Sequence, residues 1–134
     1  SCHNYLERTE AGLLHRKGSV SARKGAVVIP GSRGSLAYVC IPREDTAVSL
    51  DSLSHGAGRK WARSICKSRI DQKYDRYSIR CTGLKSRVVC HDTNLLFAEA
   101  PEAYKNVEQV MGVLQEYGLI DIAATLRPLI TFKG

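Results

Sequence analysis

Two short apolar segments joined by a turn-rich loop constrain the fold of this chain more than any other feature. Residues 26–29 read Ala-Val-Val-Ile and residues 36–41 read Leu-Ala-Tyr-Val-Cys-Ile, compositions that are typical of buried strands. Residues 30–35 between them read Pro-Gly-Ser-Arg-Gly-Ser, which is turn chemistry. The pattern predicts either a plain β-hairpin or a ligand-binding loop in which the Ser32 hydroxyl and the backbone amides meet a phosphate group.

A first helix is predicted over residues 59–73. Trp61, Ile65 and either Cys66 or Ile70 would form its apolar side, because they recur at helical spacing. Its other side would be basic, which is either a solvated helix face or a surface for a polynucleotide backbone. The cations on that side are Arg59, Lys60, Arg63, Lys67, Arg69 and Lys73.

A second and clearer helix is predicted over residues 101–118. Pro101 with Glu102 behind it is a start signal, and Gly118 is a stop signal. The apolar residues between them repeat every three or four positions, so they are expected to face the core rather than a cofactor. These residues are Val107, Val110, Met111 and Leu114.

The remaining apolar segments predict further strands. Residues 88–90 read as one short strand, and residues 119–132 read as one or two strands interrupted at Arg127-Pro128. The predicted fold class is therefore α+β, with mixed strands and two main helices. Residues 1–134 are expected to belong to a single domain.

Composition narrows the class of partner and the compartment. No apolar run approaches the roughly 18 residues that a membrane span needs, and no secretion leader opens the chain, so we expect no membrane partner. Five irregularly spaced cysteines fit a reducing cytoplasm better than a disulfide scaffold. The net charge of +7 favours a polyanionic partner. The chain opens at Ser1 and its one methionine is Met111, so we expect a piece of something longer.

Two segments near the amino terminus leave alternatives open. His3 and Asn4 are either a metal ligand with an orienting amide neighbour or a polar chain end, since a transition-metal site needs three or more ligands. Residues 13–25 are expected to form a loop that carries four cations between glycines and serines. That loop is either an anion-binding surface or a solvated turn.

Residues 54–60, which read Ser-His-Gly-Ala-Gly-Arg-Lys, are the strongest candidate for chemistry. Glycines let a backbone approach a phosphate closely, and a helix start would direct free N–H groups at it. Arg59 would add a bidentate phosphate clamp, and a neutral imidazole at His55 can attack an electrophilic phosphorus atom. The alternative is a glycine turn with a surface histidine.

Taken together, six segments in order make the chain similar to the C-terminal third of RtcB-type RNA-splicing ligases. The ending over residues 127–132 and the divergent middle are more similar to the branch associated with release-factor-H-like proteins. The matching stretches are Cys2-His3-Asn4-Tyr5, His15-Arg16-Lys17-Gly18 with Ser21-Ala22-Arg23, Ile29-Pro30-Gly31-Ser32, Ser54-His55-Gly56-Ala57-Gly58-Arg59, Glu102-Ala103-Tyr104-Lys105-Asn106 and Lys133-Gly134.

The resemblance implies a ligase that depends on GTP and Mn(II). Such an enzyme joins an RNA 2′,3′-cyclic phosphate or 3′-phosphate end to a 5′-hydroxyl end. His55 would match the histidine that attacks the α-phosphate of GTP and carries GMP, with Arg59 neutralising developing charge. GMP would then pass to the RNA 3′-phosphate, and the 5′-hydroxyl would displace it.

The resemblance also assigns binding residues. His3 would match a Mn-binding histidine, where the metal acts as Lewis acid and template. Residues matched to GTP or GMP binding come from five segments. They are Asn4, then Pro30, Gly31, Ser32 and Arg33, then Gly56, Ala57 and Gly58, and finally Tyr104 and Lys133.

Departures from the family pattern limit what the resemblance implies about guanine recognition and activity. Arg33 stands where methionine is frequent and Ala37 where a base-contacting serine often lies, so the details of guanine recognition are expected to differ. The other metal ligands and the guanine-reading glutamate of the family lie upstream, so activity is expected to require the upstream part of the same protein. Two further hypotheses remain: a non-catalytic module that holds RNA ends, and a folded domain whose motifs are relics.

Overall fold

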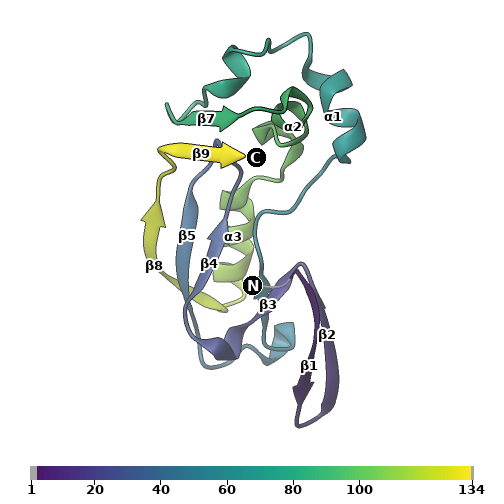
Figure 1. Ribbon diagram of the computed structural model, residues 1–134. Helices are drawn as coiled ribbons and strands as arrows, with labels where there is room; N and C mark the ends of the chain where they lie inside the picture. Colours follow the sequence, from purple (N-terminus) through teal and green to yellow (C-terminus); the bar gives the residue numbers. More distant parts are fainter. Residues whose placement is uncertain (1–2, 134) are drawn as a thin grey trace.

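The computed structural model describes residues 3–133, so Cys2 and Gly134 of the matching stretches lie outside the described residues. These residues form an α+β fold of mixed strands and helices, as predicted (Figure 1). The elements are β1 (Asn4–Thr9), β2 (Gly12–Lys17), β3 (Ser19–Ser21), η1 (Ala22–Lys24), β4 (Val27–Pro30), β5 (Ala37–Pro42), η2 (Ala47–Ser49), β6 (Ser52–Ser54), α1 (Arg63–Ile70), η3 (Ser78–Arg80), β7 (Arg87–Cys90), α2 (Thr93–Ala98), η4 (Pro101–Ala103), α3 (Val107–Glu116), β8 (Ile120–Leu126) and β9 (Ile130–Lys133).

A three-stranded antiparallel sheet in the order β4-β5-β8 forms the centre of the molecule. Strands β4 and β5 pair as an antiparallel hairpin, one of the two alternatives that the sequence left open, with Ile29 opposite Tyr38. Helix α3 lies along this sheet (Figure 1), and Val107, Met111 and Leu114 bury the predicted apolar stripe against it. The main core therefore sits between α3 and the strands that flank the 30–35 loop.

Helix α3 begins later than its sequence predicted. Pro101 opens the 3-10 turn η4, and the helix proper starts at Val107, with the Asn106 side chain accepting a hydrogen bond from the Glu108 amide. The prediction that residue 104 lies in the first helical turn is therefore wrong, since Tyr104 is extended between the two elements. Gly118 has φ +64°, which confirms its role as the stop.

Helix α1 is likewise shorter than predicted, at Arg63–Ile70. Its expected start is wrong because the backbone of Arg59 forms a bridge with Tyr104 instead of turning into a helix. Cys66 and Ile70 are buried, whereas Ile65 is 38% exposed, so only part of the predicted apolar stripe faces the core.

The amino-terminal third is more regular than the sequence indicated. Strands β1 and β2 form an antiparallel hairpin that projects from the body (Figure 1), and β3 pairs with β6. The expected loop over residues 13–25 is therefore wrong, because all four of its cations lie on β2 and η1.

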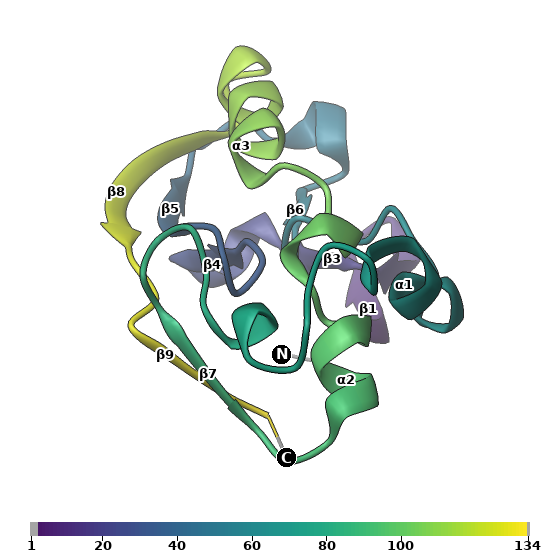
Figure 2. The same ribbon diagram turned by 90° about the horizontal axis from the view of Figure 1, so that it is seen from above.

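The last strand, β9, does not join the three-stranded sheet and pairs with β7 instead. Strand β9 runs alongside β7 (Figure 2). The two strands pair in parallel, with Lys133 opposite Cys90. A second apolar cluster packs nearby, between β7, α1 and α2, and includes Val88, Leu96 and Phe97. No helix within residues 3–133 is long and apolar enough to cross a bilayer.

Candidate active site

His55 lies directly after β6, and backbone hydrogen bonds bring it close to His3. The His55 amide donates to the Gly18 carbonyl oxygen at 3.1 Å, and the Gly18 amide donates to the His3 carbonyl oxygen at 2.8 Å. Gly18 has φ +67°, a conformation that glycine adopts without strain. As a result the imidazole rings of His3 and His55 lie 5.7 Å apart between centroids, at 72°. The structure thus joins two residues that are 52 positions apart in the sequence.

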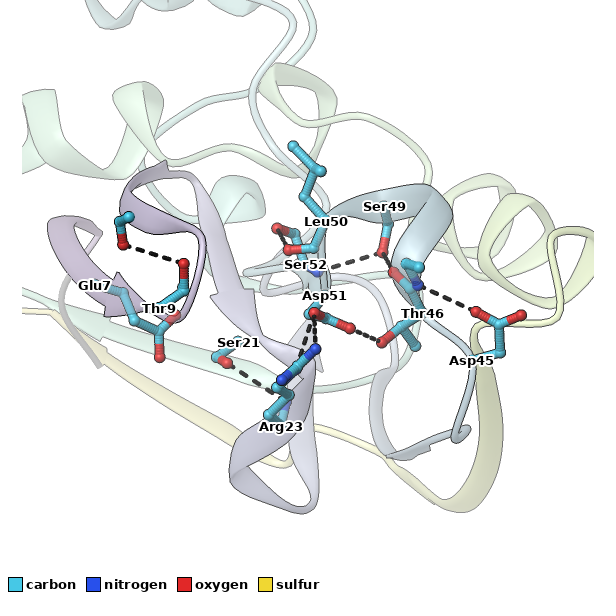
Figure 3. A network of polar contacts seen from close by, with 12 residues as sticks. Glu7, Thr9, Ser21, Arg23, Asp45, Thr46, Ser49, Leu50, Asp51 and Ser52 are labelled. Atoms are coloured by element: carbon cyan, nitrogen blue, oxygen red, sulfur yellow. Dashed lines mark hydrogen bonds and ion pairs between the residues drawn. The ribbon is translucent and has the colours of Figure 1, made fainter.

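A polar network holds the turn that precedes β6, the strand that ends directly before His55 (Figure 3). The Asp51 carboxylate accepts hydrogen bonds from the Thr46 hydroxyl at 2.7 Å and from Arg23 at 2.8 Å. These two bonds hold the pKa of Asp51 below its ordinary value. The Ser49 hydroxyl also accepts the Ser52 amide at 3.2 Å, so the first residue of β6 is anchored as well.

The glycine loop after His55 packs on Pro30 rather than opening a helix. The Ala57 amide donates to the Pro30 carbonyl oxygen at 2.9 Å, and a Cβ on Gly56 would lie 3.1 Å from the same oxygen. Helix α1 starts only at Arg63, so the expectation of a helix start at the glycines is wrong. The loop is instead a close backbone contact between the segment of His55 and the 30–35 loop.

The whole guanidinium group of Arg59 is hydrogen-bonded within the protein, and its side chain is 21% exposed. A guanidinium has five N–H donors, and here each points at an acceptor of the protein. The acceptors are the carbonyl oxygen of Trp61, Glu99 Oε1, the Tyr104 hydroxyl, the Cys66 sulfur and the carbonyl oxygen of Ala98. The role of Arg59 in phosphate binding stays a prediction, and it requires that some of these hydrogen bonds break.

Glu99 is the central acceptor of this region, and sequence reasoning missed it. The residue is 7% exposed, and its Oε1 atom lies 3.3 Å from Arg59 and 3.1 Å from Arg63. Its Oε2 atom accepts a hydrogen bond from the Tyr104 hydroxyl and lies 3.9 Å from Lys133 Nζ. Burial alone raises the pKa of Glu99, but these hydrogen bonds and positive charges bring it below its ordinary value.

One signal for Glu99 was present in the sequence. Residues 95–100 read Leu-Leu-Phe-Ala-Glu-Ala, so a single acid interrupts an apolar run. A buried carboxylate needs cationic or hydrogen-bonding partners, which makes such an acid a candidate for a site. Its partners come from four separate segments, however, and no local pattern names them.

A cavity of about 310 Å³ lies beside this carboxylate. Glu99, Ala37 and the turn at residues 126–128 contribute to its wall. Its volume is at the lower end of the range for small-molecule sites. Six of the residues assigned to nucleotide binding line it, namely Pro30, Gly31, Ser32, Arg33, Tyr104 and Lys133.

The histidine pair and the cavity are neighbours that share Pro30. Its carbonyl oxygen holds the loop of His55, and the residue itself lines the cavity. Asn4 is not part of the cavity lining, since it lies on β1, where its Oδ1 atom is 2.5 Å from His15 Nε2. The predicted site residues therefore form two adjacent groups, with Asn4 beside the histidine group through its neighbour His3.

Arg33 reaches the interior rather than open solvent. Its Nη2 atom donates to the Ile79 carbonyl oxygen at 3.0 Å, while Nε and Nη1 are buried with no hydrogen-bond partner among the described residues. Burial lowers the pKa of this guanidinium. The Arg33 carbonyl oxygen also accepts the Ser86 hydroxyl at 3.2 Å, so the loop is tied to the residues before β7.

His3 is the one described candidate for the predicted metal ion. Within residues 3–133 no three His, Cys, Asp or Glu side chains gather closely enough to hold a metal. An imidazole ligand suits Mn(II) poorly by itself, because divalent metal sites in proteins need several ligands. The described residues therefore supply at most a part of a metal site.

A cationic cavity next to paired imidazoles is a site suited to phosphate chemistry. The chain belongs to the RtcB family, since the family model described as tRNA-splicing ligase RtcB matches residues 1–134. The branch associated with release factor H stays a prediction.

Curated relatives agree with this assignment. RNA-splicing ligase RtcB2 of Escherichia coli is 44% identical over 136 residues, covering 98% of this chain and 36% of that protein. RNA-splicing ligase RtcB of E. coli K12 is 33% identical over 137 residues, covering 98% of this chain and 31% of that protein. The tRNA-splicing ligase RtcB of Pyrococcus furiosus is 36% identical over 142 residues, covering 91% of this chain and 14% of that protein. The chain thus spans about a third or less of the length of these relatives.

Proposed function

We propose that the chain is part of an RNA ligase that uses GTP and Mn(II). It would join RNA 2′,3′-cyclic phosphate or 3′-phosphate ends to 5′-hydroxyl ends in RNA repair or tRNA splicing. The names of the relatives support the ligase class. The observation that carries the chemistry is the 5.7 Å separation of the His3 and His55 rings beside a cavity lined by predicted nucleotide-binding residues.

In the first step, an imidazole nitrogen of His55 attacks the α-phosphorus of GTP. A P–N bond forms, the P–O bond to the β-phosphate breaks, and pyrophosphate leaves with the bonding electrons. At a cyclic end, water first adds to the phosphorus and the P–O2′ bond breaks, which leaves a 2′-hydroxyl and a 3′-phosphate. GMP then passes from His55 to an oxygen of the RNA 3′-phosphate, which restores the imidazole. Finally the RNA 5′-hydroxyl attacks the activated phosphorus and GMP is released.

The cavity provides the features expected of a nucleoside site. Tyr104, Lys133 and Ser32 supply polar groups, and Pro30 and Leu126 supply apolar surface. Mn(II) would supply Lewis acidity at the phosphates, with His3 as one ligand. Holding the nucleoside next to the loop of His55 makes the attack effectively intramolecular.

In this proposal, ligase activity also requires the remainder of the protein. The chain spans 36% of RtcB2 of E. coli, and the described residues hold only part of a metal site. Strands β8 and β9 and the turn between them also expose large apolar side chains, which marks an interaction surface. These are Ile122, Leu126, Leu129, Ile130 and Phe132.

A covalent-adduct experiment tests the function. The intact protein is incubated with α-labelled GTP and Mn(II), and the adduct is located by peptide mass spectrometry. We expect GMP on His55 and its loss in His55→Ala. His91→Ala is the control, because His91 is exposed and does not line the cavity. An adduct that survives His55→Ala refutes the assignment.

A non-catalytic RNA-binding module is the second candidate. The favouring observation is the cationic surface around Trp61, where Lys60 Nζ and the Arg69 guanidinium carbon lie 5.3 Å and 5.0 Å from the ring centroid. Cations interleaved with an aromatic ring suit a single-stranded nucleic acid. This candidate predicts salt-dependent RNA binding by the intact protein without any GMP adduct.

A further inference from the structure

Two polar groups of the cavity wall are held by one carboxylate. The Tyr104 hydroxyl and Lys133 Nζ, which come from residues 29 positions apart, both face Glu99 Oε2. Both residues line the cavity, as Glu99 itself does. A tyrosine hydroxyl and a lysine ammonium otherwise sample several rotamers, so a shared anchor decides where they point.

The hydrogen bonds also determine whether the Tyr104 hydroxyl donates a hydrogen bond to a ligand or accepts one from it. Its hydroxyl hydrogen is given to Glu99, and Arg59 Nη1 donates to its oxygen at 3.2 Å. The hydroxyl is therefore left to act toward the cavity as an acceptor, not as a donor. Lys133 is less tightly held, at 3.9 Å, and it remains a donor.

Glu99 further connects the cavity to the segment of His55. Arg59 donates to Glu99 Oε1, and the backbone around Arg59 pairs with Tyr104. The Lys105 amide also donates to the Gly58 carbonyl oxygen at 2.9 Å, so the glycine loop is hydrogen-bonded to the residues after η4.

From this geometry we propose that Glu99 is a positioning residue for the nucleotide. Its carboxylate orients Tyr104 as an acceptor and Lys133 as a donor on one wall of the cavity, and Arg59 aligns that wall with the loop of His55. Glu99 acts through these residues and not on the reacting phosphorus. The inference rests on the proposed function, and it adds a residue that the resemblance did not assign.

Separate measurement of the half-saturating GTP concentration and the maximal rate tests the proposal in the intact protein. Single-turnover formation of the GMP adduct is measured against GTP concentration for wild type, Glu99→Gln and Glu99→Asp. We expect Glu99→Gln to raise the half-saturating GTP concentration by about tenfold or more, the effect of losing one charge-assisted hydrogen bond. The maximal rate changes by less than about threefold, because the nucleophile is untouched. Glu99→Asp keeps the charge and gives an intermediate value.

Glu102→Gln is the matched control. Glu102 is also a partly buried carboxylate three residues away, but it pairs with Lys73 at 2.7 Å and Tyr74 at 2.6 Å and does not line the cavity. It is expected to leave the half-saturating GTP concentration within about twofold of wild type. An equal rise in Glu102→Gln and Glu99→Gln assigns the effect to general stability and overturns the proposal.

A second readout does not depend on ligase activity. Ring-labelled tyrosine NMR follows the ionisation of Tyr104, assigned with Tyr104→Phe. Burial and the hydrogen bond to Glu99 raise the pKa of Tyr104, so Glu99→Gln is expected to lower it toward the ordinary value. Absence of any GMP adduct in wild type refutes the proposed function, while the Tyr104 titration still decides on the contact. An unchanged Tyr104 titration and an unchanged GTP requirement in Glu99→Gln refute the positioning role.

Discussion

A single absent methyl group at residue 31 allows the 30–35 loop to close over the core. A Cβ on Gly31 would lie 2.6 Å from the Leu36 carbonyl oxygen and 3.0 Å from Val107 Cγ1. Backbone atoms cannot move aside easily, so Gly31→Ala is expected to destabilise the fold by about 2 kcal/mol. Urea unfolding measures this change.

Gly83→Ala provides the comparison. A Cβ at Gly83 meets no atom within 4 Å, so this variant should stay within about 0.5 kcal/mol of wild type. Equal unfolding midpoints for the two alanine variants would contradict the steric argument at Gly31.

The fit of Arg59 depends on the shape of its side chain as well as its charge. Lysine has three donors on one nitrogen and cannot reach five acceptors spread around a plane. Arg59→Lys is therefore expected to cost about 2 kcal/mol of unfolding free energy. Arg63→Lys should cost less than about 1 kcal/mol, because the Arg63 side chain is 68% exposed and makes one bond to Glu99. The order of the two midpoints in urea is the deciding measurement, and the reverse order would exclude an interior role for Arg59.

At the scale of elements, the cap of α3 offers the clearest test. The Asn106 side chain accepts the Glu108 amide at 2.8 Å and so satisfies one donor that the first turn leaves unpaired. Asn106→Ala is expected to lower the unfolding free energy by about 1 kcal/mol, whereas Asn106→Asp keeps the acceptor and should be nearly neutral. Thermal or urea unfolding that ranks both variants equally would show that the cap does not stabilise α3.

Elements whose signals are local were predictable from sequence. The β4–β5 hairpin follows from two apolar segments and the turn residues between them, and Arg127-Pro128 correctly separates β8 from β9. The starts of α1 and α3 were not predictable, because Arg59 and Tyr104 pair with each other across 45 residues. A tertiary backbone bridge overrides a local start signal and leaves no trace in the pattern that surrounds either residue.

The residues of the candidate site likewise include some that could be predicted from the sequence and some that could not. The resemblance assigned His3 and His55 to one site, because each lies in a recognisable short segment, and the structure places the two rings close together. The shared role of Glu99 was not predictable, since it depends on three cations and a tyrosine that come from different parts of the chain. Charge pairing of this kind is specified by the fold and not by spacing along the chain.

At the scale of the whole molecule, acid should weaken the fold through its paired carboxylates. Glu99 and Glu102 have pKa values held below their ordinary value of 4.5, in each case against burial and because of cationic and tyrosine partners. Their contribution is complete above the unfolded value and is lost as pH falls through the lower, folded values. The urea midpoint should therefore decline below about pH 4.5.

Glu99→Gln tests which carboxylate matters for that decline. The stability difference between this variant and wild type should shrink as the pH is lowered, because the wild-type carboxylate becomes protonated. A difference that stays constant from pH 7 to pH 3 would exclude ionised Glu99 as a source of the acid sensitivity.

The pairing of β9 with β7 has a practical consequence for anyone who purifies this protein. That ladder places Lys133 in the cavity wall, so a polyhistidine tag fused after this segment would lie close to the proposed nucleotide pocket. Such a tag would bring extra imidazoles and charge to the place where a guanosine is proposed to enter. Placing the tag at the opposite terminus should give the higher affinity for GTP, and a side-by-side titration of both fusions would reveal it.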